Sequence, residues 1–240
     1  MVRGYGGTVE FVVENYGDSE LARRFGVTRY PAIFVDDVLV AKPKDFGFYG
    51  KGEGAGDGRY TPWKSAASHE LFQTDVKRAL DAVLAGRKQE ARATAPEAAE
   101  TAPPPLPAFS LVDLQGRPLA GDDLKGRVVL VEFWATWCPP CRGTLSWLGE
   151  LQKRYGDRLA VLAIAVESDE KDVRKVADEM MKLDVRWAIG TPETARAFGD
   201  VSAVPTLHLF DAQGRGVASF LGAPPSLHTD AEAKLRQVLP

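Results

Sequence analysis

The feature that most constrains this fold is an apolar run that ends close to the chain's only two cysteines. The run, Val128–Trp134, is rich in β-branched and aromatic residues and predicts a buried strand. The residues after the cysteines, 142–155, place leucines at helical spacing and predict a helix. Cys138 and Cys141 therefore stand where a strand ends and a helix begins.

The spacing of Cys138 and Cys141 allows a disulfide within one helical turn. No further cysteine exists to complete a zinc site or a disulfide framework, and the chain has three histidines, so a zinc site would need improbable ligands. A lone CxxC pair in an α/β protein indicates a catalytic pair rather than a structural one. We predict a redox site with no metal and no cofactor.

Composition narrows the class of partner. The net charge is −3 and the isoelectric point is near 5.7, which argues against nucleic acid as the main partner. The sequence has no apolar run long enough to span a bilayer, and its first residues lack the apolar core of a secretory signal. We therefore expect a cytoplasmic protein as the chain stands, and a periplasmic one if its N-terminus is truncated.

Two regions are separated by a stretch rich in proline and alanine, residues 87–106, which predicts an extended linker. In the C-terminal domain, 107–240, strands and helices alternate, which implies a sheet covered on both faces. We expect strands at 109–113, 128–134, 159–166, 206–210 and 216–221, and helices at 138–155, 172–183, 192–198 and 229–238.

Several motifs of this domain resemble the thioredoxin superfamily, in particular its TlpA/ResA-like branch. They are the run FSLVDLQGRPLAGDDLKGRVVLVEFWATWCPPCR at 109–142, the later Val204-Pro205-Thr206, and the turn 211–215. The resemblance implies an α/β fold, a thioredoxin-like three-layer α/β/α sandwich. It also implies a thiol-disulfide oxidoreductase, with disulfide-containing protein substrates and an upstream thiol reductant as partners.

The N-terminal segment, 1–86, is similar to the second half of a thioredoxin domain. It offers an expected strand at Val9–Glu14, a short helix at 19–25 and a strand led by proline at 30–35. The half that would carry a CxxC is absent, which leaves a sheet edge without a neighbour. Either the chain begins downstream of its true start, which we favour, or a degenerate half-domain docks on a partner.

Position assigns the two sulfurs different roles. Cys138 at the helix N-terminus is the expected nucleophile, because unpaired amides and the helix dipole favour a thiolate there. Cys141, one turn further, is expected to resolve the mixed disulfide. Neither Pro139 nor Pro140 can donate a backbone N–H to the thiolate. We therefore expect a reducing potential, nearer about −270 mV than about −120 mV.

Glu132 interrupts the apolar strand on the side shared by Val128, Leu130 and Trp134. A carboxylate there is costly to bury unless it is paired or protonated. The resemblance implies that it lies beneath the buried cysteine as general base for Cys141. The alternative is a glutamate that reaches solvent at a sheet edge.

The resemblance also supplies a substrate-binding set: Trp137, Pro139, Pro140, Val204, Pro205 and Thr206. Pro205 resembles the family's cis-proline, beside which the backbone of Val204 could pair with a substrate strand. An ordinary trans proline at a strand start is the alternative. Trp137 is expected to form an apolar lip beside Cys138.

Two other functions compete with protein-disulfide reduction. A thiol peroxidase shares the broad fold class, but the residues before Cys138 lack the Pro-x-x-x-Thr-x-x-Cys setting of a peroxiredoxin. A redox-modulated interaction module would use the N-terminal segment as its docking surface.

Overall fold

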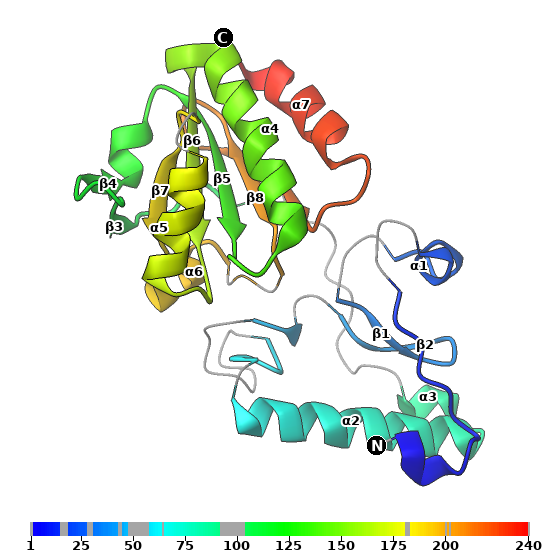
Figure 1. Cartoon of the computed structure of the whole chain (residues 1–240). Helices are drawn as coiled ribbons and strands as arrows, with labels where there is room; N and C mark the ends of the chain where they lie inside the picture. The colour runs from blue at the N-terminus through cyan, green and yellow to red at the C-terminus, as the bar shows by residue number, and fades with distance from the viewer. Residues whose placement is uncertain are drawn as a thin grey trace. The chain divides into compact units, whose positions relative to one another are not determined.

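The computed structural model describes residues 2–14, 19–27, 31–42, 45–47, 58–63, 65–91, 104–180, 183–199, 201 and 203–239. The chain divides into two compact units, Met1–Glu97 and Ala98–Pro240. In Figure 1 the first unit runs from blue to cyan and the second from green to red.

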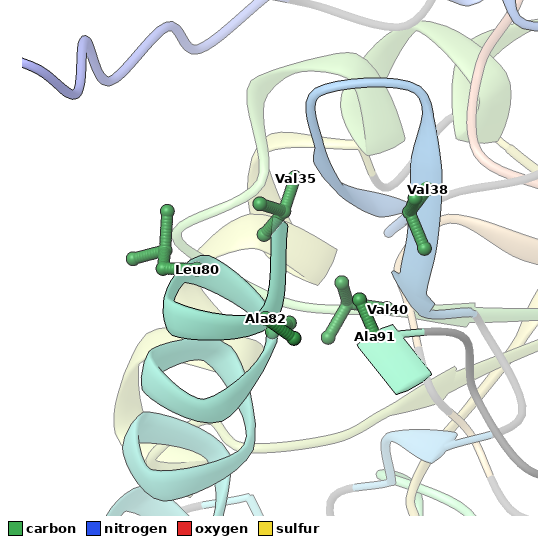
Figure 2. Close-up of a cluster of buried hydrophobic side chains, with 7 residues drawn as sticks. Val35, Val38, Val40, Leu80, Ala82 and Ala91 are labelled. Carbon is green, nitrogen blue, oxygen red and sulfur yellow. The ribbon is translucent and has the colours of Figure 1, made fainter. Parts of the chain in front are cut away.

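The N-terminal unit packs one long helix against a small hairpin. Its elements are the 3-10 helix Val2–Tyr5, α1 (Glu20–Arg24), β1 (Ile33–Val35), β2 (Val38–Ala41), α2 (Ala66–Leu84) and α3 (Lys88–Ala91). Figure 2 shows the apolar cluster that joins the hairpin to α2 and α3, in which hairpin valines meet Leu80 and Ala82 of α2 and Ala91 of α3. Burial of these side chains is what holds so short a hairpin in place.

The predicted strand Val9–Glu14 is wrong. The segment has no strand structure, and Phe11, Val12 and Val13 are exposed. No described strand pairs with it, and Glu14 instead accepts hydrogen bonds from Ser19 Oγ (2.6 Å) and Leu21 N (3.1 Å) at the start of α1. The predicted helix at 19–25 is confirmed as α1. The predicted strand led by proline is shorter than expected, and Tyr30 lies outside the described residues.

The predicted linker, 87–106, is ordered at both of its described ends. Helix α3 falls inside it, and Ala91 is buried against the hairpin, so the N-terminal unit extends beyond residue 86. At the other end, Leu106 N donates to Gly214 O at 2.8 Å. Residues 92–103 lie outside the described part of the chain. An extended linker remains a prediction for that central stretch alone.

The C-terminal unit is built on a five-stranded sheet with the order β7-β6-β5-β8-β9. The central strand β5 runs parallel to β6 and antiparallel to β8. Its elements are β3 (Ser110–Val112), β4 (Pro118–Ala120), β5 (Val128–Trp134), α4 (Pro139–Tyr155), β6 (Leu159–Ala165), α5 (Glu170–Glu179), β7 (Arg186–Ile189), α6 (Pro192–Ala197), β8 (Thr206–Phe210), β9 (Gly216–Leu221) and α7 (Leu227–Val238), with 3-10 turns at Gly121–Leu124 and Gly156–Arg158.

Helices cover both faces of this sheet. Right-handed crossovers from β5 to β6 and from β6 to β7 place α4 and α5 on one face, in front of the sheet in Figure 1. Helix α7 joins α4 through the ion pair Arg154–Glu232 (2.8 Å). On the opposite face, Phe133 of β5 meets Phe198 at the end of α6, with ring centroids 5.2 Å apart. The three-layer arrangement expected from the sequence is therefore present.

The expected strands and helices of this unit are confirmed to within two residues at each end, with the exception of one helix. Helix α5 begins at Glu170 and ends at Glu179, earlier than the predicted end at Leu183. Leu183 leaves the helix and lies against Gly149 of α4, where no side chain larger than hydrogen would fit without displacing it. Among the described helices of the chain, none has the length and hydropathy needed to cross a membrane.

His208 of β8 belongs to the aromatic core on the α6 face rather than to a catalytic site. Its ring lies 5.9 Å from Phe133 and 5.7 Å from Phe198, and its Nδ1 is 2.8 Å from Ser219 Oγ. Burial lowers the pKa of His208 to about 4. In the unfolded chain the same imidazole titrates near 6.5.

This difference predicts a loss of stability in mild acid. As the pH falls from 6.5 toward 4, the unfolded chain binds a proton that the folded chain does not. The contribution of His208 to the free energy of unfolding should therefore decrease, by up to about 1.4 kcal/mol per pH unit. A His208→Gln variant keeps a partner for Ser219 and should lose this slope in urea titrations at pH 7 and pH 5. An unchanged slope would show that other groups cause it.

Candidate active site

The two cysteines lie in a disulfide at the start of α4. Strand β5 ends at Trp134, a short turn follows, and Cys138 is the N-cap residue of the helix. Pro139 and Pro140 occupy its first two positions, where the missing N–H of proline costs no helical hydrogen bond. The disulfide joins Cys138 to Cys141, with their Cα atoms 5.4 Å apart.

The surroundings of the two sulfurs differ. Cys138 retains 4% of its surface, whereas Cys141 has none. Beside Cys138, the side chain of Trp137 is 57% exposed, and Pro139 and Pro140 are also exposed. An incoming group can therefore approach only the first cysteine, across an apolar surface formed by these three residues.

A loop from the neighbouring strand fixes the turn that precedes Cys138. Ser168 Oγ accepts from Thr136 N at 2.9 Å and donates to Val166 O at 2.9 Å. The indole Nε1 of Trp137 donates to Glu167 O at 2.9 Å. Glu167 has φ 48°, a left-handed conformation that is uncommon outside glycine. Neither Glu167 nor Ser168 could be recognised from the sequence, because no motif marks a glutamate or a serine that holds the turn before a cysteine.

The peptide bond between Val204 and Pro205 is cis, as expected from the resemblance. Thr206 begins β8 directly opposite Phe133 of β5, so the cis bond lies at the edge of the sheet from which the Cys138 turn emerges. Pro205 O accepts from Gly222 N at 2.7 Å, and Thr206 Oγ1 donates to Ala203 O at 2.7 Å. Val204 is 9% exposed, and the two residues after it are buried.

The residues of the predicted substrate-binding set differ in their exposure to solvent. Trp137, Pro139 and Pro140 present surface to solvent, whereas Pro205 and Thr206 are buried and hold the turn. A direct contact between any of these residues and substrate remains a prediction.

Glu132 is fully buried in the central strand of the sheet. Its neighbours across the sheet are Ala163 on β6 and Leu207 on β8. Because Phe133 faces α6, the alternation of the strand directs Glu132 to the face covered by α4, the helix that carries Cys141. The alternative of a glutamate that reaches solvent is therefore wrong.

The carboxyl of Glu132 has no compensating contact. Neither of its oxygens has a hydrogen-bond partner in the described part of the chain. Desolvation raises the pKa of Glu132 well above its ordinary value. Burial therefore favours the neutral over the ionised form of a carboxyl that lies on the side of the sheet facing the dithiol helix.

The positive charge nearest in sequence to the dithiol is engaged elsewhere. Arg142 Nη1 lies 2.9 Å from Glu179 Oε2 of α5, and both side chains are half exposed. Within the described residues, no three His, Cys, Asp or Glu side chains cluster as a metal site would require. The arrangement thus combines one reachable sulfur, one buried sulfur and one buried acid, which suits thiol-disulfide exchange.

Comparison with known proteins agrees with this geometry. The model of the Redoxin family matches residues 101–239. The thioredoxin-like protein YneN of Bacillus subtilis (strain 168) is 39% identical over 112 residues, which are 45% of this chain and 64% of YneN. The thiol-disulfide oxidoreductase ResA of Bacillus cereus is 30% identical over 118 residues, 48% of this chain and 67% of ResA.

The chain thus spans about two thirds of the length of these curated relatives. Among solved structures, a thiol:disulfide interchange protein of the thioredoxin family from Chlorobium tepidum TLS is 31% identical, with a TM-score of 0.52. That match covers 59% of this chain and all of the Chlorobium chain. A strand, a dithiol at a helix N-terminus and a cis-proline at one sheet edge thus occur in a chain that belongs to the redoxin family, within the ResA-like branch of the thioredoxin superfamily.

Proposed function

We propose that the protein is a thiol-disulfide oxidoreductase that reduces disulfides in other proteins through Cys138 and Cys141. The observation that carries this proposal is the difference between the two sulfurs. Cys138, at a helix N-terminus, keeps 4% of its surface exposed beside an exposed apolar rim, whereas Cys141, one turn behind it, keeps none. That difference assigns attack on the substrate to the first and its release to the second.

Reduction proceeds in two exchanges that balance. The Cys138 thiolate attacks one sulfur of the substrate disulfide, the substrate S–S bond breaks, and the other substrate sulfur leaves and takes a proton. Cys141 then attacks Cys138 Sγ, the mixed disulfide breaks, and the second substrate sulfur leaves. Two electrons pass from the dithiol to the substrate, and a thiol reductant must return them.

Glu132 is the group that we propose accepts the Cys141 proton in the second exchange. Burial raises the pKa of Glu132, which makes its carboxylate a stronger base toward the Cys141 proton. When the reductant later opens the Cys138–Cys141 disulfide, the same proton is available to Cys141 as its sulfur leaves. Both directions then avoid a lasting charge inside the apolar layer between β5 and α4.

The prolines of the motif support the reducing direction. They occupy the first two helical positions and have no N–H, so two of the amides that would stabilise a Cys138 thiolate are missing. The Cys141 N–H donates to Cys138 O at 3.2 Å. A less stabilised thiolate makes the dithiol a stronger reductant.

The surface around Cys138 suits a polypeptide substrate. Trp137, Pro139 and Pro140 offer apolar, exposed contacts, and the cis bond between Val204 and Pro205 lies at the same edge of the sheet. Trp137 is itself held by Glu167 O, so it loses little freedom when a substrate binds.

Two measurements on the full chain test this function. The reduced protein should reduce insulin disulfides in the presence of dithiothreitol, and it should equilibrate with glutathione at a potential nearer about −270 mV than about −120 mV. A potential above about −180 mV would reverse the direction of electron flow. Consumption of hydrogen peroxide without insulin reduction would favour a peroxidase.

A further inference from the structure

A second buried polar group on β5 lies beside Glu132. Trp134 is fully buried, and its indole Nε1 has no hydrogen-bond partner in the described part of the chain. The same holds for both carboxyl oxygens of Glu132. A donor and an acceptor, each costly to bury alone, therefore occur two residues apart on one strand.

The sheet directs the two side chains to the same side. Residues two apart on a strand face the same way, with Cα atoms about 7 Å apart. On the adjacent strand β6, the residues paired with Glu132 and Trp134 are Ala163 and Ala165. These alanines have small side chains, so larger side chains of the neighbouring strands can extend over them. Trp187 of β7 does so, and its ring centroid lies 5.6 Å from that of Trp134.

No other ionisable side chain is buried around Glu132 in the described part of the chain. Helix α4 buries Cys141, Thr144, Leu145, Leu148, Gly149, Leu151 and Gln152, α5 buries Val173, Val176 and Ala177, and α7 buries Leu227, Ala231 and Leu235. The other buried acids of this unit, Asp113 and Asp211, lie in turns and pair with arginines. In the oxidised protein, Cys138 and Cys141 do not titrate.

We propose that Trp134 is a positioning residue for proton transfer, whose Nε1–H donates a hydrogen bond to one water that in turn donates to the Glu132 carboxylate. An indole N–H only donates, so it favours the ionised acid over the neutral one. It thereby stabilises the ionised form of Glu132, which is the form that can accept the Cys141 proton. The catalytic meaning rests on the proposed function, but the contact itself does not.

The first test uses the oxidised full chain, in which no turnover is needed. With ¹⁵N-labelled tryptophan, the Trp134 Nε1–H signal, assigned from Trp134→Phe, should shift with pH and follow the Glu132 carboxyl. The shift should vanish in Glu132→Gln. The Trp137 signal is the internal control, because that indole is bonded to Glu167 O.

Three results would overturn the contact: a Trp134 signal that ignores a titrating Glu132, one that titrates equally in Glu132→Gln, or no titration of either group up to pH 10. These results need no substrate, so they do not depend on whether the protein is a reductase.

The second test is kinetic. If Trp134→Phe folds, the pH profile for resolution of the mixed disulfide should move to higher pH, with a rate at pH 7 about tenfold lower, as expected for loss of one hydrogen bond to a charged group. In the Glu132→Gln background, Trp134→Phe should not change the pH dependence of the resolution rate. A profile that moves equally in both backgrounds would assign Trp134 to packing alone.

Discussion

Replacement of Cys141 with Ala should turn the protein into a trap that stays covalently attached to its substrates. Cys138 can still attack a substrate disulfide, but the buried sulfur that would displace the substrate is missing. Mixed disulfides should accumulate, and turnover of insulin should fall by about a thousandfold or more, since removal of a covalent participant eliminates its step. Non-reducing gels and mass spectrometry of trapped species measure this directly.

The matched variant is Cys138→Ser. It removes the reachable nucleophile, so it should abolish turnover and form no mixed disulfide. Both cysteines pack at the same helix start, and the comparison therefore separates chemistry from a general loss of structure. Trapping by the Cys138→Ser protein through Cys141 would contradict the assignment, because Cys141 has no exposed surface.

Replacement of Glu132 with Leu should make the protein more stable and slower. The carboxyl is fully buried with no hydrogen-bond partner in the described part of the chain, and Leu has a similar size without polar atoms. The free energy of unfolding at pH 7 should rise by about 1–3 kcal/mol, the cost of an unsatisfied buried polar group. Resolution of mixed disulfides should slow by about a hundredfold, as for loss of a general base.

The stability gain should depend on pH in one direction. The unfolded chain loses the Glu132 proton near pH 4.5, whereas the folded chain keeps it to higher pH because desolvation raises the pKa. Above pH 4.5 this carboxyl therefore binds more proton in the folded state, and its contribution to the stability of the wild type falls as the pH rises, by up to about 1.4 kcal/mol per pH unit. Urea titrations from pH 4 to pH 8 should show that the difference in free energy of unfolding between the Leu variant and the wild type grows as the pH rises.

The control for this experiment is Glu132→Gln, which removes the ionisation but keeps a buried polar group. It should lose the pH dependence without the full gain of the Leu variant. If both variants are less stable than the wild type at pH 8, then the contacts of the carboxyl outweigh the cost of its burial, and the expected gain in stability is wrong. An unchanged rate of resolution in both variants would remove its role as a base.

The C-terminal fold could be predicted because its signals are local. The strand Val128–Trp134 and the helix that follows it each carry their own periodicity, and the structure places β5 over the expected residues. The burial of Glu132 follows from the same alternation, once the strand is known to be central. The strand order β7-β6-β5-β8-β9 depends on pairing between distant segments, and the motifs alone did not predict it.

Where the prediction failed, the deciding contacts were not local. Val9–Glu14 has the composition of a strand, but a strand forms only beside a partner, and none of the described strands pairs with it. The helix α3 lies in a stretch with weak helical pattern and is fixed by Ala91 against the hairpin. Ser168 acts on Thr136, far away in sequence, through a hydroxyl that no spacing rule would select.

A second contact made by the same loop has a consequence for how substrates are selected. Trp137 is tethered to the carbonyl of Glu167, in a loop that leads into α5, and not to the helix of the dithiol. Sequence changes in that loop can therefore move Trp137 and alter the surface beside Cys138 while the CxxC motif stays unchanged. Close relatives could then catalyse the same thiol-disulfide exchange and still differ in the protein substrates that they bind.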